Sequence, residues 1–254
     1  MSNNPILTIG YSTLSERISN IQPPELQIES KVFISIQDPA GRGFDLPKSY
    51  KFEYISAQAK GVAKSRNVVL ESTSSKYLLF ADDEIHFAPK SIEAAVAFLE
   101  SNPSIDLVLA QTVDTNGDLR KRYPLKQTKL NLFNSAKAAT YEMLVRVDSI
   151  KAKGIRFDES FGAGVDNYLG DEYIFISDLL KAKGSAVFLP LTIAIHPVES
   201  SGSGWGSAKD LRVRAAIFTR VFGPWAPLVR LAFYFKSYKK TPGLRSLITF
   251  VRGK

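Results

Sequence analysis

The chain has 254 residues, of which 44% are hydrophobic, and it contains no cysteine. This length allows one domain with a sizeable core. The absence of cysteine excludes disulfides, zinc–thiolate sites and a cysteine nucleophile. The N-terminus lacks a basic segment followed by a long apolar run, so we expect no signal peptide. No uncharged apolar run reaches the roughly 18 residues that span a bilayer.

The net charge of +8 is concentrated near the C-terminus. Residues 205–254 contain 11 Lys or Arg and a single acid, Asp210, which gives this segment a charge of +10. Residues 1–204 contain the other 22 Lys or Arg and 24 acids, which gives −2. This asymmetry indicates an anionic partner, either a membrane surface or a nucleic acid.

Apolar periodicity predicts strands and helices that alternate through the first hundred residues. We expect strands over residues 5–11, 31–37 and 76–81, a helix over 56–72, and an amphipathic helix over 91–101. The alternation predicts an α/β fold with a Rossmann-like, mostly parallel sheet flanked by helices.

The second half of the chain continues with strands over residues 105–112, 140–147 and 186–195, and with a helix over 172–183. The pair Asn116-Gly117 is a hairpin turn signal. The Gly- and Ser-rich stretch 200–204 is typical of a mobile loop, and the composition becomes basic after it. We therefore divide the chain into a main domain, 1–206, and a C-terminal helical basic tail, 207–254.

The most informative motif is the acidic cluster that ends the strand at 76–81. Asp82, Asp83 and Glu84 follow this apolar run directly. The carboxyl ends of strands in an open α/β sheet border the ligand crevice. Carboxylates gathered there suit Mg²⁺ or Mn²⁺, and such a cation suits a phosphate-bearing substrate. The alternative is a solvated acidic loop.

Other polar residues occupy comparable positions. Asp171 and Glu172 open a helix; capping accounts for Asp171 and leaves Glu172 as a catalytic candidate. His196 directly follows the last predicted strand, although a lone histidine is commonly structural. Arg66 borders the apolar face of its helix, where it could reach a phosphate or steady the carboxylates, unless this face is simply solvated.

The chain lacks three motifs that would point to other enzymes. No GxGxxG follows the first strand, and neither GxxxxGK[ST] nor GxSxG occurs. The sequence therefore gives no support to a dinucleotide-binding fold, a P-loop enzyme or a GxSxG hydrolase.

The motifs that are present resemble, in this order, the family 2 glycosyltransferases of GT-A fold. The resemblance is greatest to bacterial members that assemble capsular and other surface polysaccharides. It rests on ILTIGYST, FISIQDP, KGVAKSRNVVLE, KYLLFADDE, FDESFGAG, GDEYIF and HPVESSG. It implies that 1–206 is a GT-A catalytic domain. It also implies a hexosyltransferase that moves a sugar from a nucleotide-sugar donor, UDP-linked, to a hydroxyl of a glycan or lipid-linked acceptor.

The resemblance also assigns a nucleotide-binding set of residues. Asp38 would contact the nucleobase, with Tyr11 and Ser12 forming the floor beneath it. Arg66 would support the nucleotide site, and Asp82 would lie near the ribose and the diphosphate.

A second set concerns the metal and the chemistry. Asp83 would bind Mn²⁺ or Mg²⁺, with His196 as a further ligand. Glu172, paired with Asp171, would be the catalytic base. One base and one metal suffice for a single displacement, which inverts the anomeric configuration. The chain departs from the family pattern at Ala81, where the usual D-x-D begins, and in having Asp-Glu where Glu-Asp is commoner.

The basic tail predicts attachment to a membrane. Residues 208–222 form an amphipathic pattern, and the apolar segments 228–235 and 247–251 alternate with cations. Apolar residues among cations suit an anionic headgroup boundary. We expect a cytoplasmic protein, peripheral on the inner face of the cell membrane, with no nucleic acid as partner. The alternative is that these helices pack on the catalytic domain.

Two other functions stay open. One is a non-catalytic protein that binds nucleic acid or lipid through its tail. The other is a nucleotidyltransferase that makes the activated sugar, although GYSTLSERIS is not the glycine-rich basic loop typical of that class.

Overall fold

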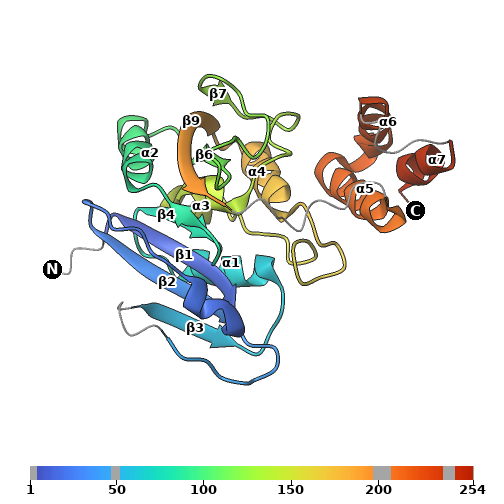
Figure 1. The fold of residues 1–254 in the computed structure, drawn as a ribbon. Helices are drawn as coiled ribbons and strands as arrows, with labels where there is room; N and C mark the ends of the chain where they lie inside the picture. The colour runs from blue at the N-terminus through green and yellow to red at the C-terminus, as the bar shows by residue number, and fades with distance from the viewer. Residues whose placement is uncertain (1–4, 47–51, 197–206, 237–243, 254) are drawn as a thin grey trace.

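The computed structural model of the chain describes residues 5–46, 52–196, 207–236 and 244–253 (Figure 1). Its strands are β1 (Leu7–Leu14), β2 (Ser30–Gln37), β3 (Glu53–Ala57), β4 (Tyr77–Ala81), β5 (His86–Phe87), β6 (Leu107–Val113), β7 (Thr128–Lys129), β8 (Met143–Arg146) and β9 (Ala186–Ile195). They form one sheet in the order β3-β2-β1-β4-β8-β6-β9-β5, and β7 pairs with β9.

The sheet is mostly parallel, as the sequence predicts. β3, β2, β1 and β4 run parallel to one another, and so do β6 and β9. β8 is antiparallel to both of its neighbours, β4 and β6. Because of this reversal, the N-terminal end of β8 lies at the same edge of the sheet as the C-terminal ends of β4 and β6.

Helices cover both faces of the sheet. They are α1 (Val62–Ser72), α2 (Pro89–Ser101), α3 (Val147–Ala152), α4 (Asp171–Lys181), α5 (Ala208–Phe222), α6 (Ala226–Lys236) and α7 (Leu244–Arg252), with 3-10 turns η1 (Ser15–Asn20), η2 (Thr140–Glu142) and η4 (Gly223–Trp225). η1 and α2 pack into one core cluster, whereas α1, α3 and α4 pack into the other. Since both faces are covered, β4 is buried at every position, which explains its unbroken apolar run.

The predicted helix over 56–72 is wrong in its first part. Its opening residues belong to β3, an edge strand whose residues are all exposed. Such a strand carries no apolar alternation in sequence, so its pairing with β2 cannot be seen before the fold is known. Gly61, at φ 131°, then turns the chain into α1.

Two smaller predictions also change. The strand expected over 140–147 begins with η2 and becomes extended only at Met143. The hairpin expected around Asn116-Gly117 is reduced to one bridge between Val113 and Leu119, since the chain then leaves the sheet.

The basic tail is folded onto the rest of the protein. Val213, Ile217 and Val221 of α5 pack against Phe161, Tyr173 and Ile174, which lie in and just before α4. A second small core joins α5 to α6 and α7 through Leu211, Ala215, Tyr234 and Phe250. For α5, the structure therefore agrees with the alternative that the tail packs on the main domain. Every helix in the described residues is too short or too polar to cross a bilayer.

Several predicted features fall outside the described residues. They are the 200–204 loop, the boundary at 206/207, and the part of the HPVESSG motif that follows His196.

The packing of α5 on α4 can be tested at Gly170. This residue caps α4 at φ 93°, and a Cβ there would lie 2.4 Å from Ile217 Cδ1. Gly117 has a similar φ of 87°, but nothing lies within 4 Å of its Cβ position. We expect Gly117→Ala to lower the free energy of unfolding by about 1 kcal/mol, the cost of left-handed backbone. Gly170→Ala should lower it by a further 1–3 kcal/mol, roughly, because of the clash. Urea unfolding measures both, and equal losses would contradict the packing.

Candidate active site

Three of the predicted site residues, Asp38, Asp82 and Asp83, follow the carboxyl ends of β2 and β4. The parallel register pairs Tyr11 with Ala81, so that the residues following Ala81 lie level with the end of β1. Thr13 Oγ1 accordingly donates to Asp83 Oδ2 at 2.5 Å. Asp38 follows β2 at the same edge.

The centre of the site is the buried guanidinium of Arg66, which is 5% exposed. Its Nη2 donates to Asp82 Oδ1 at 3.1 Å, and its Nη1 donates to Asp171 Oδ2 at 2.5 Å. Glu172 Oε1 lies 3.5 Å from the same Nη1. The guanidinium also lies over the ring of Phe157, 5.7 Å from its centroid. One cation thus joins the end of β4 to the start of α4 through three carboxylates.

The role of Asp171 differs from helix capping. Gly170, in the left-handed region, occupies the cap position of α4, and no side chain caps the helix there. The carboxylate of Asp171 is directed to Arg66 instead and is only 3% exposed. Capping therefore does not explain this acid, whereas a buried ion pair does.

Glu172 is held in place and is still reachable from solvent. Thr140 Oγ1 donates to its Oε1 at 2.8 Å, and the side chain is 21% exposed. Burial raises the pKa of Glu172 to about 7, and the neighbouring Asp171 adds to the rise against the opposing effect of Arg66. A carboxylate with a pKa near neutrality, next to an open surface, suits a general base.

Asp83 is engaged by a residue that the sequence motifs do not indicate. Arg17, in η1, lies 2.6 Å from Asp83 Oδ1 and also contacts Glu84. Burial raises the pKa of Asp83. Both oxygens of Asp83 thus have partners, one in Arg17 and one in Thr13.

The carboxylates of Asp82 and Asp83 are the groups that could hold the predicted divalent cation. Mg²⁺ is commonly held by one or two carboxylates together with substrate phosphates, and Asp82 and Asp83 supply such oxygens. In the part of the chain that the structure describes, no three His, Cys, Asp or Glu side chains gather closely enough to hold a metal ion. Asp83 and Asp82 would therefore need a phosphate ligand to complete a metal site, and the assignment of Asp83 as a metal ligand stays a prediction.

His196 follows β9 and lies beside other side chains of this edge. Its Nδ1 accepts from Arg120 Nη1, and its ring lies 5.1 Å from that of Tyr141, centroid to centroid. The assignment of His196 as a second metal ligand stays a prediction.

The three residues predicted to contact or support the nucleobase, Asp38, Tyr11 and Ser12, lie in surroundings that differ from one another. Asp38 accepts from the backbone N–H groups of Gly43 and Arg42, and these bonds, that of Gly43 foremost, lower its pKa. Tyr11 is fully buried in the core, so it could support a floor only from beneath. Ser12 Oγ is buried without a hydrogen-bond partner. These three assignments also stay predictions.

Sequence reasoning missed Thr13, Arg17 and Thr140. Thr13 could have been found from the register of two parallel strands that end together. Arg17 and Thr140 lie in 3-10 turns, which carry no periodic signal, and each reaches its carboxylate across more than 30 positions of sequence.

Comparisons with known proteins agree with this geometry. The sequence model of the Glycosyl transferase family 2 matches residues 42–160, which include Arg66, Asp82 and Asp83. No protein of curated function matches the sequence.

Solved structures of Staphylococcus aureus TarS share the fold. TarS 1-349 in complex with UDP-GlcNAc is 14% identical with a TM-score of 0.60, over 97% of this chain and 79% of that one. The UDP complex of the same fragment is 14% identical with a TM-score of 0.57, over 92% and 72%. The longer TarS structure is 13% identical with a TM-score of 0.57, over 93% of this chain and only 44% of that one. This chain therefore spans less than half of that longer protein.

At these identities the structural likeness establishes the GT-A type of fold, and the sequence match covers residues 42–160, just under half of the chain. The resemblance predicted from the motifs is thus confirmed: residues 42–160 match the sequence model of the family 2 glycosyltransferases, and the whole chain is similar in fold to the TarS structures.

Proposed function

We propose that the protein is a metal-dependent, inverting glycosyltransferase with a nucleotide-sugar donor, UDP-linked, and a glycan or lipid-linked acceptor used in surface polysaccharide synthesis. The observation that carries this proposal is the bridge from Asp82, at the donor side, through Arg66 to Glu172. The TarS structures with UDP-GlcNAc and UDP support a uridine nucleotide in the donor.

The donor would lie over the carboxyl ends of β1, β2 and β4. Asp38, Asp82 and Asp83 surround this surface, and their charges repel a diphosphate unless a cation intervenes. A divalent cation bound at Asp83 would neutralise the charge that grows on the leaving diphosphate. Asp38 retains lone pairs for a nucleobase N–H, because a carboxylate accepts about four hydrogen bonds.

Glu172 would start the reaction as a general base. Its carboxylate takes the proton of the acceptor hydroxyl as the hydroxyl oxygen attacks the anomeric carbon. The bond between that carbon and the diphosphate oxygen breaks, and the nucleoside diphosphate leaves with the electron pair. Attack from the face opposite the leaving group inverts the anomeric configuration. Thr140 and Arg66 keep the carboxylate oriented throughout.

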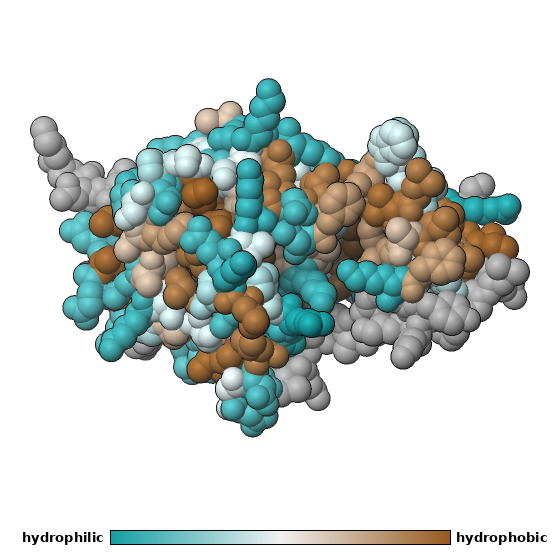
Figure 2. Space-filling model, turned by 90° about the horizontal axis from the view of Figure 1, so that it is seen from above, coloured by the Kyte–Doolittle hydropathy of each residue, from teal (hydrophilic) through white to brown (hydrophobic). Residues whose placement is uncertain are grey.

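The tail would hold the enzyme against a membrane through one face of α6. Trp225, Leu228, Leu231 and Phe235 follow one another at helical spacing and are 37–68% exposed. The opposite face, with Ala226, Arg230 and Tyr234, is buried. Figure 2 shows apolar side chains gathered over the C-terminal helices. An exposed apolar stripe in a segment of charge +10 suits an anionic leaflet.

Removing the base should stop catalysis and leave binding intact. We expect Glu172→Gln to lower the rate of sugar transfer, and of donor hydrolysis by water, by about 10²–10⁴-fold, because an amide cannot accept the proton. UDP binding, measured by calorimetry, should stay within about twofold of wild type. Glu100→Gln, at an exposed glutamate of α2, is the matched control. Full activity of Glu172→Gln would refute the assignment of the base.

Arg17 should compete with a metal ion for Asp83. We expect Arg17→Ala to tighten Mn²⁺ binding without nucleotide by up to about fivefold, the equivalent of the ~1 kcal/mol of a partly exposed ion pair. Asp83→Asn should abolish this binding. Electron paramagnetic resonance of free Mn²⁺ measures both, and Arg156→Ala, which breaks an ion pair with Glu71, is the control. Weaker binding in Arg17→Ala would contradict the competition.

The membrane role of α6 is tested with vesicles. Leu228→Glu combined with Phe235→Glu should reduce binding to phosphatidylglycerol vesicles by at least about tenfold, since each side chain loses an apolar contact of roughly 1.5–3 kcal/mol. Ile6→Glu combined with Ile55→Glu, at exposed apolar positions just before β1 and in β3, should bind as wild type. Equal binding by both double variants in a flotation assay would count against this face.

A further inference from the structure

A second concentration of positive charge lies in the catalytic domain, in the loop between β6 and β8. This basic loop, residues 119–138, contains Arg120, Lys121, Arg122, Lys126, Lys129 and Lys137, and no acid. It carries +6 within a segment, 1–204, whose 22 cations and 24 acids sum to −2. The rest of that segment is therefore at −8, so the loop is a local exception to the charge of the domain.

The topology brings this loop next to the proposed base. The loop follows β6, pairs with the start of β9 through β7, and returns through η2 to β8, whose first residue lies at the edge where β4 ends in Asp82. Thr140 of η2, two residues beyond the loop, donates to Glu172. At the other end of the loop, Arg120 contacts His196. The two ends of the loop thus border the site on the side of β8 and β6, whereas Asp38 and Arg66 border it on the side of β2 and α1.

A buried carboxylate anchors the loop. Glu142 is fully buried and accepts from Lys121 Nζ at 2.8 Å, from the Tyr123 hydroxyl at 2.5 Å and from the backbone N–H of Ala139 at 3.1 Å. The Tyr123 ring stacks on Phe188 at 5.8 Å. A buried carboxylate with three donors holds its partners in one arrangement, so the cations of the loop are presented from a fixed base.

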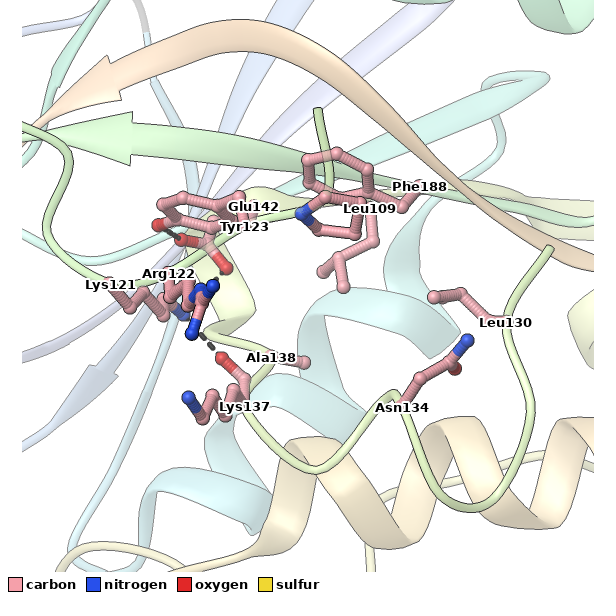
Figure 3. A pocket seen from close by; sticks show the side chains of 11 residues that line it. Leu109, Lys121, Arg122, Tyr123, Leu130, Asn134, Lys137, Ala138, Glu142 and Phe188 are labelled. Carbon is pink, nitrogen blue, oxygen red and sulfur yellow. Dashed lines mark hydrogen bonds and ion pairs between the residues drawn. The ribbon is translucent and has the colours of Figure 1, made fainter. Parts of the chain in front are cut away.

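Lys121 is neutralised by Glu142, but the exposed cations are not. Arg122, Lys126, Lys129 and Lys137 are exposed, and none of them pairs with an acid in the described part of the chain. Lys121, Arg122 and Lys137 lie along one side of a cavity of about 50 Å³, opposite Leu130 and Asn134 (Figure 3). This cavity is too small for a sugar ring, yet it is bordered by cations that can hold an anionic group at its mouth.

We propose that this loop binds phosphate groups of the acceptor, so that the enzyme takes a phosphate-bearing glycan rather than a neutral one. This deepens the proposed function and rests on Glu172 as the base. Lysine and arginine side chains spaced along a loop match phosphates repeated along a flexible chain. A hydroxyl of a glycan held there would lie beside Glu172, on the side away from the nucleotide.

The test compares two ligands that differ only in charge. The first is a glucose oligomer carrying several phosphate groups, and the second is the same oligomer without them. We expect wild-type protein to bind the phosphorylated oligomer in fluorescence anisotropy, with affinity that falls as salt rises. Arg122→Ala combined with Lys137→Ala should weaken this binding about tenfold and reduce the slope of log K against log salt by about two.

The matched control removes two exposed cations outside the loop. Lys90→Ala combined with Lys183→Asn makes the same change in net charge, and Asn tolerates the left-handed backbone at position 183. This control should bind the phosphorylated oligomer as wild type. Equal weakening in both double variants, or equal wild-type affinity for the two oligomers, would overturn the proposal.

Additional binding measurements distinguish other ligands of the loop, and they test the loop assignment separately from the proposed donor. The proposal fails if oligothymidylate of equal phosphate number binds the loop more tightly than the phosphorylated glycan does. It also fails if the loop variant loses binding to vesicles and keeps binding to the glycan, because the loop then serves another partner. UDP binding should be unchanged in the loop variant. If wild-type protein fails to bind UDP but the loop variant still loses the phosphorylated glycan selectively, the proposed donor is wrong and the loop assignment is supported.

Discussion

The site depends on one buried cation that holds three carboxylates. Arg66 comes from α1, Asp82 from the end of β4, and Asp171 with Glu172 from the start of α4, so the guanidinium joins three elements that sequence keeps up to 105 positions apart. Removing one partner of such a cluster leaves uncompensated buried charge, at a typical cost of 3–5 kcal/mol, roughly. Burial and the neighbouring Asp171 raise the pKa of Glu172, and the contact with Arg66 opposes this rise, so the same cluster affects both the stability of the site and its chemistry.

Arg66 and Arg17 pair with different acids at this edge of the sheet, and they differ in burial. Arg66 is buried and bonded to several carboxylates, whereas Arg17 is partly exposed where it pairs with Asp83 and Glu84. This suits a site in which one carboxylate is permanently positioned and the other becomes available when a phosphate ligand arrives. The charges of the chain are also divided unevenly, with Asp38, Asp82 and Asp83 on the proposed donor side, the basic loop beside the proposed base, and 11 of the 33 Lys and Arg residues within 205–254.

Much of this arrangement could be predicted from sequence. Strands β1, β2, β4 and β9 and helices α2, α4 and α5 follow from apolar periodicity, and the clustering of Asp38 with Asp82 and Asp83 follows because parallel strands end at one edge. The ion pair of Asp171 could not be predicted, since a helix-start acid reads as a cap until its distant partner is known. The sequence also could not predict edge strand β3 or the roles of Arg17 and Thr140. Exposed strands and 3-10 turns carry no periodic signal, and their contacts are set by tertiary packing.

The central claim is that Glu172, with its pKa raised by burial next to Asp171, acts as the base. The most direct measurement is the pH dependence of donor hydrolysis by the wild-type protein under single-turnover conditions. Only the deprotonated carboxylate accepts a proton, so the account predicts that the rate falls as pH is lowered, with its midpoint at about 7. A rate that stays constant down to about pH 5, as for a glutamate of ordinary pKa, would contradict it.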